Sequence, residues 1–117
     1  MAAAWTQLVP VFAEMSSITP MLRLPGALQS RGTEIARQLT DSVVAGCGQF
    51  CTNPGMIIGI RSPQFSAFLQ QMSDNIASSP AQTMLNRGVL SSYQHGLQEL
   101  SQHPGVTHLA GQPQQGA

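Results

Sequence analysis

The sequence contains no lysine, and its five basic residues are all arginines, spread along the chain from Arg23 to Arg87. Without lysine the chain cannot form a Schiff base with a carbonyl substrate, and it lacks the lysine of a Walker-type phosphate loop. Five acidic residues balance the arginines, so the formal net charge is zero. Because nucleic-acid binding needs a basic stripe that displaces counterions from phosphates, this charge pattern argues against a nucleic-acid partner.

Long apolar runs are absent as well. No stretch approaches the roughly 20 apolar residues that cross a bilayer, and the opening MAAAW does not lead into the charged and apolar regions of a signal peptide. We therefore expect no membrane partner and a cytoplasmic location, where thiols stay reduced. The chain has 117 residues, 42% of them hydrophobic, which suits one globular domain with a modest core.

Apolar periodicity predicts an α/β fold. Continuous apolar runs indicate strands buried on both faces, and apolar residues recurring four or seven positions apart from Leu28 to Val43 indicate an amphipathic helix. The expected elements are strands over 8–13 and 21–24, a helix over 27–45, a strand over 56–60, helices over 62–78 and 89–103, and a strand over 106–110. This order predicts a mostly parallel sheet flanked by helices, with an ordered core over 8–110 and a flexible tail over 111–117.

Two predicted helices carry further patterns. In the helix over 27–45 the charged residues are expected to form a solvated face: Arg31, Glu34, Arg37 and Asp41. In the helix over 89–103 four side chains are expected to point inward: Leu90, Tyr93, Leu97 and Leu100. Glycines at 46 and 48 are expected to stop the first helix, and Ser62-Pro63 is expected to begin the second.

The chain has two cysteines, Cys47 and Cys51, four positions apart. We expect no metal site, because a zinc site needs about four ligands and the histidines lie more than forty positions away. A disulfide requires Cα atoms within about 7 Å, and a reducing compartment disfavours it. A thiol redox role is disfavoured because the spacing is not the usual C-x-x-C.

The two cysteines differ in their setting. Cys47 ends the predicted helix, where packing as a small apolar residue explains it. Cys51 follows in the turn-forming stretch GQFCTNPG, and such a turn exposes a side chain beside backbone N–H groups, as a nucleophile and its oxyanion require. Cys51 is therefore a candidate nucleophile, with an inert thiol as the alternative.

A second candidate is Glu14, which closes the first apolar strand in the stretch FAEMSS. It is either a solvent-exposed strand end or a partly buried base whose pKa burial raises toward neutrality. The two stretches occur in this order, with Glu14 37 positions before Cys51.

Together these motifs resemble the aldehyde dehydrogenase superfamily, in which a glutamate opening a Glu-Leu-Gly-Gly-like motif precedes a Gly-Gln-x-Cys nucleophile by a similar interval. The variant forms EMSSITP and FCTNPG look most like the branch of α-ketoglutaric semialdehyde (2,5-dioxovalerate) dehydrogenases and NADP-dependent fatty aldehyde dehydrogenases. The likeness continues through LPGALQSRGTEIA and PAQTML, and so covers most of the chain from Pro10 to about Val106.

The resemblance implies oxidation of an aldehyde, such as α-ketoglutaric semialdehyde, to a carboxylic acid with NAD or NADP. Cys51 would attack the carbonyl to give a thiohemiacetal, hydride would pass to the nicotinamide, and a thioester would remain. Glu14 would activate the water that hydrolyses this thioester, and the Cys51 backbone N–H would contribute to the oxyanion hole. Met15 would lie near the nicotinamide through its backbone, and Cys47 has no catalytic counterpart.

The chain also departs from the family pattern. The upstream asparagine of the oxyanion hole, the downstream glutamate that holds the cofactor ribose and the dinucleotide fingerprint have no counterpart in it. We therefore expect residues 1–117 to be a partial catalytic domain, an internal piece from which the cofactor-binding domain is absent. The alternative is an inactive α/β module that associates with itself as a homo-oligomer through exposed apolar surface.

Overall fold

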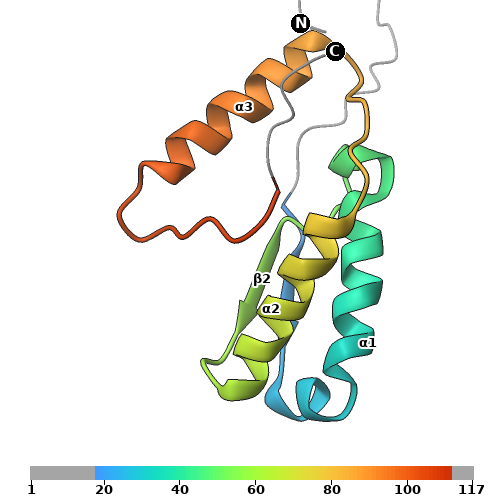
Figure 1. The fold of residues 1–117 in the computed structure, drawn as a ribbon, viewed down its shortest axis with the longest axis vertical. Helices are drawn as coiled ribbons and strands as arrows, with labels where there is room; N and C mark the ends of the chain where they lie inside the picture. The colour runs from blue at the N-terminus through green and yellow to red at the C-terminus, as the bar shows by residue number, and fades with distance from the viewer. Residues whose placement is uncertain (1–17, 112–117) are drawn as a thin grey trace, which may run out of the picture.

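The computed structural model of the protein describes residues 18–111. Its elements, in chain order, are β1 (Pro20–Arg23), α1 (Pro25–Val44), the short 3₁₀ helix η2 (Ala45–Gly48), β2 (Met56–Gly59), α2 (Pro63–Ser78) and α3 (Arg87–Ser101) (Figure 1). The predicted α/β class is confirmed, and each predicted helix is present with ends shifted by a few residues. The strand predicted over 8–13 lies outside the described residues, and of the predicted tail only residue 111 is described.

The two strands form a parallel pair, as the sequence predicts. Their register pairs Pro20 with Met56 and Arg23 with Gly59, so both strands begin side by side at one edge of the sheet. A parallel pair needs a long crossover between its strands, and α1 is the main element of that crossover. The stretches that lead into β1 and β2 therefore reach the same edge.

The core lies between α1, α2 and one face of this sheet. Five side chains are buried there: Leu28, Ala36, Leu39, Phe68 and Met72. Met21 of β1 and Ile57 of β2 pack against this cluster from the sheet side. Because residues alternate between the two faces of a strand, the neighbouring residues Leu22 and Ile58 point the other way.

The outer face of the sheet is open in the described part of the chain. Leu22 is 66% exposed and Ile58 is 45% exposed, and Met56 and Ile60 are exposed too. The prediction of a buried strand over 56–60 is therefore wrong, since three of its apolar side chains are exposed. Both helices that follow the strands cover the same face, so no described helix covers the other.

Local signals explain where the helices begin. The Ser62 hydroxyl accepts the Phe65 N–H (3.1 Å) and Pro63 occupies the first turn of α2, as predicted. Asn86 caps α3 in the same way, with its side chain accepting the Val89 N–H (3.0 Å). Among the described residues, no helix has the length and apolar content needed to span a bilayer.

Two predictions about the C-terminal part are wrong. Residues 106–110 do not form a strand in the described structure; instead they lie against α2, where the Ser73 hydroxyl donates to the Leu109 carbonyl (3.1 Å). No residue of α3 is buried in the described structure, and Tyr93 and Leu100, expected to point inward, are exposed. The reason is visible in Figure 1, where α3 stands away from the α1–α2 pair instead of packing on it.

Candidate functional site

The stretch that carries Cys51 begins with a reversal of backbone handedness. After α1, three successive residues take positive φ: Gly46 (56°), Cys47 (58°) and Gly48 (72°). Glycine adopts this left-handed conformation readily, so the predicted stop of the helix at Gly46 and Gly48 is confirmed. Cys47 is the non-glycine residue in this turn, and an L-residue adopts the conformation only at a cost in free energy.

Cys51 lies on a tight turn. The Asn53 backbone N–H donates to the Phe50 carbonyl (3.0 Å), so Cys51 occupies the second position of a four-residue turn. Cys51 is exposed to solvent. The turn predicted from the sequence is therefore present, and the role of Cys51 as a nucleophile stays a prediction.

The Cys51 turn is attached to the end of α1 through a side chain. The Asn53 Nδ2 donates to the Val43 carbonyl (2.8 Å), which belongs to the last turn of α1 and has no helical donor of its own. Pro54, the next residue, is buried. The turn is thus fixed on its C-terminal side by one amide and one buried ring.

Two glutamine side chains join η2 to the loop between α2 and α3. Gln82 donates from Nε2 to the Val44 carbonyl (3.1 Å) and accepts the Cys47 N–H at Oε1 (3.0 Å). Gln49 donates from Nε2 to the Gly46 carbonyl (2.9 Å) and accepts the Leu85 N–H at Oε1 (2.9 Å). We call these two side-chain amides the glutamine bridge.

Sequence reasoning did not assign a role to Gln82. It recognised PAQTML only as part of a resemblance, and a polar residue after a proline gives no indication of partners 35 and 38 positions away. No periodicity or motif signal could have found this pairing, because it depends on where the loop after α2 passes the end of α1.

Cys47 is half-buried and lies in η2, beyond the last residue of α1. It is not among the residues of the apolar core cluster. Its sulfur lies 3.6 Å from the Gln82 carbonyl, and its backbone N–H donates to the same residue. Its setting is therefore more polar than the predicted packing at a helix end.

Glu14 and Met15, the other two predicted site residues, lie outside the described residues. Ile18, the first described residue, packs against Gly55 of the Cys51 stretch: a Cβ added at Gly55 would lie 3.2 Å from Cγ1 of Ile18. This contact and the Pro20–Met56 pairing come from the same end of the sheet.

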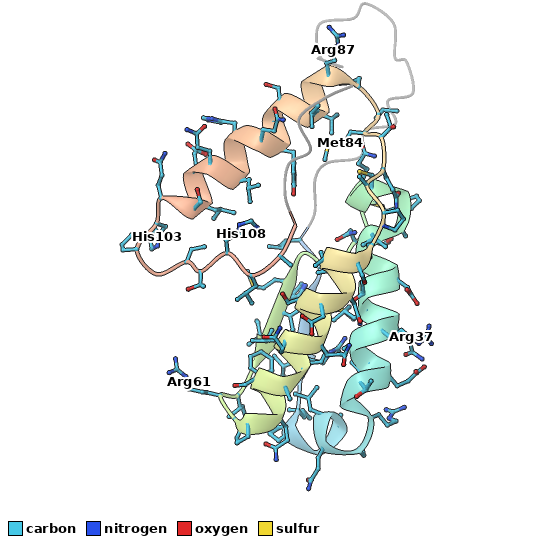
Figure 2. All side chains as sticks on the ribbon, in the orientation of Figure 1. Arg37, Arg61, Met84, Arg87, His103 and His108 are labelled. Atoms are coloured by element: carbon cyan, nitrogen blue, oxygen red, sulfur yellow. The ribbon has the colours of Figure 1, made fainter. Side chains whose placement is uncertain are left out.

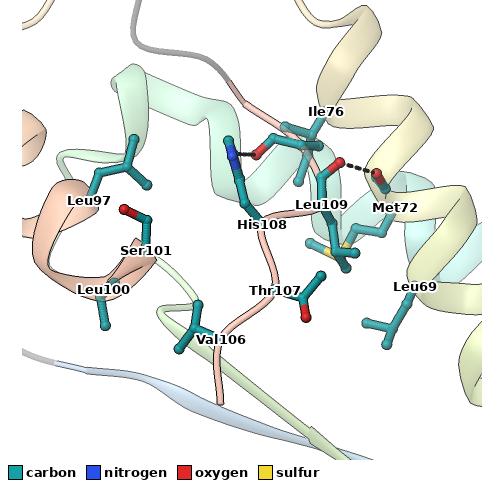
Figure 3. Close-up of a pocket in the computed structure, with 12 residues that line it drawn as sticks. Leu69, Met72, Ile76, Leu97, Leu100, Ser101, Val106, Thr107, His108 and Leu109 are labelled. Atoms are coloured by element: carbon teal, nitrogen blue, oxygen red, sulfur yellow. Dashed lines mark hydrogen bonds between the residues drawn. The ribbon is translucent and has the colours of Figure 1, made fainter. Parts of the chain in front are cut away.

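Neither of the two cavities found in the described part of the chain includes Cys51. One, of about 300 Å³, is lined mainly by apolar side chains of α2, α3 and the loop over 106–110 (Figure 3). The other, of about 550 Å³, is more polar and lies at the N-terminal halves of α1 and α2. Cys51 itself is exposed, so the turn lies at the surface.

Charged residues are scattered over the described surface. Figure 2 shows Arg37, Arg61 and Arg87 pointing away from the body in different directions. Arg37 pairs with Glu34 and Asp41, both at 3.0 Å, on the exposed face of α1, which confirms the predicted solvated face. The hydrogen bond from Arg37 lowers the pKa of Glu34.

No group of three or more histidine, cysteine, aspartate or glutamate residues is placed to hold a metal ion within 18–111.

The resemblance to the aldehyde dehydrogenase superfamily is confirmed by comparison with curated proteins, and the α/β fold is consistent with a fragment of such an enzyme. Alpha-ketoglutaric semialdehyde dehydrogenase of Acinetobacter baylyi is 45% identical over 104 residues, which cover 89% of this chain and 20% of the relative. Alpha-ketoglutaric semialdehyde dehydrogenase 2 of Azospirillum brasilense is 42% identical over 108 residues, which cover 92% of this chain and 21% of the relative. The chain thus spans about a fifth of the length of the curated relatives it matches. No family model matches the chain.

Proposed function

We propose that this chain is a partial catalytic domain that carries two catalytic groups, Cys51 and Glu14, for the oxidation of an aldehyde with NAD or NADP. The proposed substrate class is a semialdehyde such as α-ketoglutaric semialdehyde, after the names of the relatives. The observation that carries the proposal is the parallel register of β1 and β2, because it relates the stretches that lead to both groups.

Glu14 precedes Pro20 by six positions and Cys51 precedes Met56 by five, and Pro20 and Met56 are paired. In a parallel pair the residues leading into both strands approach the same edge of the sheet. Stretches of five and six residues reach at most about 20 Å, so both groups are tethered to one end of the pair. This supports a shared site at that edge.

In the proposed reaction, the Cys51 thiolate forms a bond to the aldehyde carbon, and the carbonyl π electrons move to the oxygen. The Cys51 backbone N–H would donate to this oxygen. NAD or NADP, when bound, would supply the oxidation of this carbon to the thioester by accepting its hydride. Glu14 then takes a proton from a water molecule that attacks the acyl carbon, and the Cys51 sulfur leaves as a thiolate. An exposed turn suits Cys51 because the substrate must reach the sulfur.

The described residues do not fit a dinucleotide. Its pyrophosphate needs a glycine-rich strand-to-helix turn with backbone N–H groups directed at it. The helices that follow β1 and β2 begin instead with Pro25 and Pro63, and proline has no N–H to offer. We therefore assign the cofactor to other parts of a longer enzyme, with Met15 as the contact proposed for this chain.

The nucleophile is tested by alkylating the chain with iodoacetamide and locating the modified cysteine by peptide mass spectrometry. We expect Cys51 to react before Cys47, and α-ketoglutaric semialdehyde to slow the reaction of Cys51 but not that of Cys47. Equal, slow modification of both thiols with no effect of the aldehyde would contradict the proposal.

The base is tested by acylating Cys51 with an activated acetyl ester and following the hydrolysis of the acyl group. Glu14→Gln is expected to slow this hydrolysis by about 10²-fold, the lower range for a general base. Glu99→Gln, at an exposed position on α3, is the matched control and should leave the rate unchanged. If both variants deacylate like the parent chain, Glu14 is not the base.

The second candidate function is self-association without catalysis, favoured by the open face of the sheet with its exposed Leu22 and Ile58. It predicts a concentration-dependent increase in mass by analytical ultracentrifugation. It also predicts that Cys51 shows no special reactivity, so the alkylation experiment separates the two candidates.

A further inference from the structure

We propose that Gln82 is a positioning residue for Cys51, acting through the glutamine bridge that holds the left-handed turn η2. The importance of this geometry for chemistry rests on the proposed role of Cys51 as a nucleophile. The contacts that make up the bridge are independent of that role.

The Gln82 amide uses both of its ends on the same short stretch of backbone. Its nitrogen donates to the Val44 carbonyl, the last residue of α1, and its oxygen accepts the N–H of Cys47 three residues later. A helix end leaves its last carbonyls without donors, and an L-residue with positive φ has no inherent preference for that conformation. Gln82 thus satisfies a helix end and fixes the strained residue with one planar group.

The bridge also has a reciprocal half. Gln49 donates to the Gly46 carbonyl and accepts the Leu85 N–H, so each glutamine bonds the backbone of the segment that carries the other. Three of the four bonds cross between the two segments, so sliding of one segment past the other would break bonds of both amides. Cys51 is two residues beyond Gln49 in the chain.

Apolar packing at this place is local: the Phe50 ring lies over Gly46, and Pro54 is buried. None of the residues of η2 is buried in the described structure, and the apolar core cluster contains no residue between Val43 and Ile57. The hydrogen bonds that tie the stretch from η2 to Cys51 to its neighbours therefore include those of Gln82 on one side and Asn53 on the other. A nucleophile requires such support, since small displacements of a reacting atom cost large factors in rate.

Hydrogen exchange of single backbone amides tests the bridge directly. In Gln82→Ala the Cys47 amide loses the Gln82 oxygen as an acceptor, and the Asn53 amide, which closes the Cys51 turn, loses the support of η2. We expect both amides to exchange about tenfold faster, in line with the loss of one or two ordinary hydrogen bonds. Gln82→Glu keeps the oxygen that accepts the Cys47 N–H, so this amide should be affected less than in Gln82→Ala.

Gln94→Ala is the matched control, because Gln94 is an exposed glutamine on α3. It should change neither amide. Amides of Leu39 and Phe68, in the core of α1 and α2, should exchange at parent rates in all variants, which shows that the chain remains folded.

The reactivity of Cys51 is the second measurement. In Gln82→Ala the pH profile of its alkylation should shift, with a severalfold change in rate at neutral pH, whereas Gln94→Ala should reproduce the parent profile. Unchanged exchange at Cys47 or at Asn53 in Gln82→Ala overturns the proposal, as does faster exchange at both with an unchanged alkylation profile.

If Cys51 of the parent chain is no more reactive than a simple thiol, the nucleophile proposal fails and the positioning role for chemistry fails with it. The exchange data then still report whether Gln82 holds the turn. The two failures are thus distinguishable.

Discussion

At the scale of single residues, side-chain amides hold the backbone around Cys51. Asn53 and Gln82 donate to carbonyls at the end of α1, and Gln49 adds a side-chain donor to the Gly46 carbonyl, which also accepts the Gln49 backbone N–H. An unpaired carbonyl away from water costs free energy comparable to a lost hydrogen bond, so these amides stabilise a stretch that has little apolar burial.

The first prediction concerns Asn53. Asn53→Ala removes the 2.8 Å bond to the Val43 carbonyl and should lower the free energy of unfolding by about 1 kcal/mol, the usual net value of a neutral hydrogen bond. Urea denaturation followed by circular dichroism measures the change. Thr52→Ala, at the exposed neighbouring position, is the control and should stay within about 0.5 kcal/mol of the parent. Equal effects of both substitutions would contradict this role.

The second prediction concerns Glu34, whose pKa is lowered first by the hydrogen bond from Arg37 and then by its charge. Arg37→Ala should move the Glu34 pKa upward to its ordinary range, as measured by a carboxyl carbon NMR titration. Since the folded pKa lies below the unfolded one, the pair contributes stability above the unfolded pKa, and this contribution is lost as pH falls through the folded pKa. Arg87→Ala is the control and should leave the Glu34 pKa unchanged. If Arg87→Ala raises the Glu34 pKa as much as Arg37→Ala does, the effect comes from net charge and not from the contact with Arg37.

At the scale of secondary-structure elements, helix starts and stops could be predicted because they depend on neighbours in the chain. Ser62 and Pro63 begin α2, and Gly46 and Gly48 end α1, by local backbone preferences alone. The strand expected over 106–110 failed because an apolar run does not specify its pairing partner. In the structure this segment bonds Ser73 of α2 instead.

The third prediction concerns two glycines in different elements. A Cβ at Gly59, the last residue of β2, would overlap the ring of Phe65, whereas a Cβ at Gly96 in α3 would meet nothing within 4 Å. Gly59→Ala should therefore destabilise the chain by about 1–3 kcal/mol through overpacking. Gly96→Ala should stabilise it by about 0.5–1 kcal/mol because alanine favours a helix. Thermal unfolding of the two variants checks this, and a gain in stability for Gly59→Ala would show that the Phe65 ring moves aside.

At the scale of the whole molecule, one sheet face and one helix lack, within residues 18–111, the cover that an α/β fold usually provides. The sequence predicts the presence of these elements but not their exposure, since the apolar pattern of a strand is the same whether or not a second layer covers it. For the candidate site, the sequence predicts Cys51 on its turn, while the partners of Gln82 depend on tertiary structure.

The fourth prediction follows from the open face of the sheet. Leu22→Lys places a charge at a position that is 66% exposed and should reduce concentration-dependent association in sedimentation experiments, with little change in stability. Leu85→Lys is the matched control, because Leu85 is 81% exposed and belongs to the loop before α3 and not to the sheet. If both substitutions reduce association equally, net charge and not the sheet face controls it.

The left-handed turn from Gly46 to Gly48 has a consequence in terms of chirality. Three successive residues have the opposite hand to the helix they follow, and the middle one is an L-amino acid. A D-residue prefers positive φ for the same steric reason that an L-residue avoids it. In a chemically synthesised chain, D-alanine at position 47 should therefore be more stable than L-alanine by about 1–2 kcal/mol. The chain with D-alanine should also be more stable than the chain with glycine at this position, because glycine loses more backbone entropy on folding. Thermal unfolding of the three chains would rank them, and this position would accept a mirror-image building block that the flanking helix would reject.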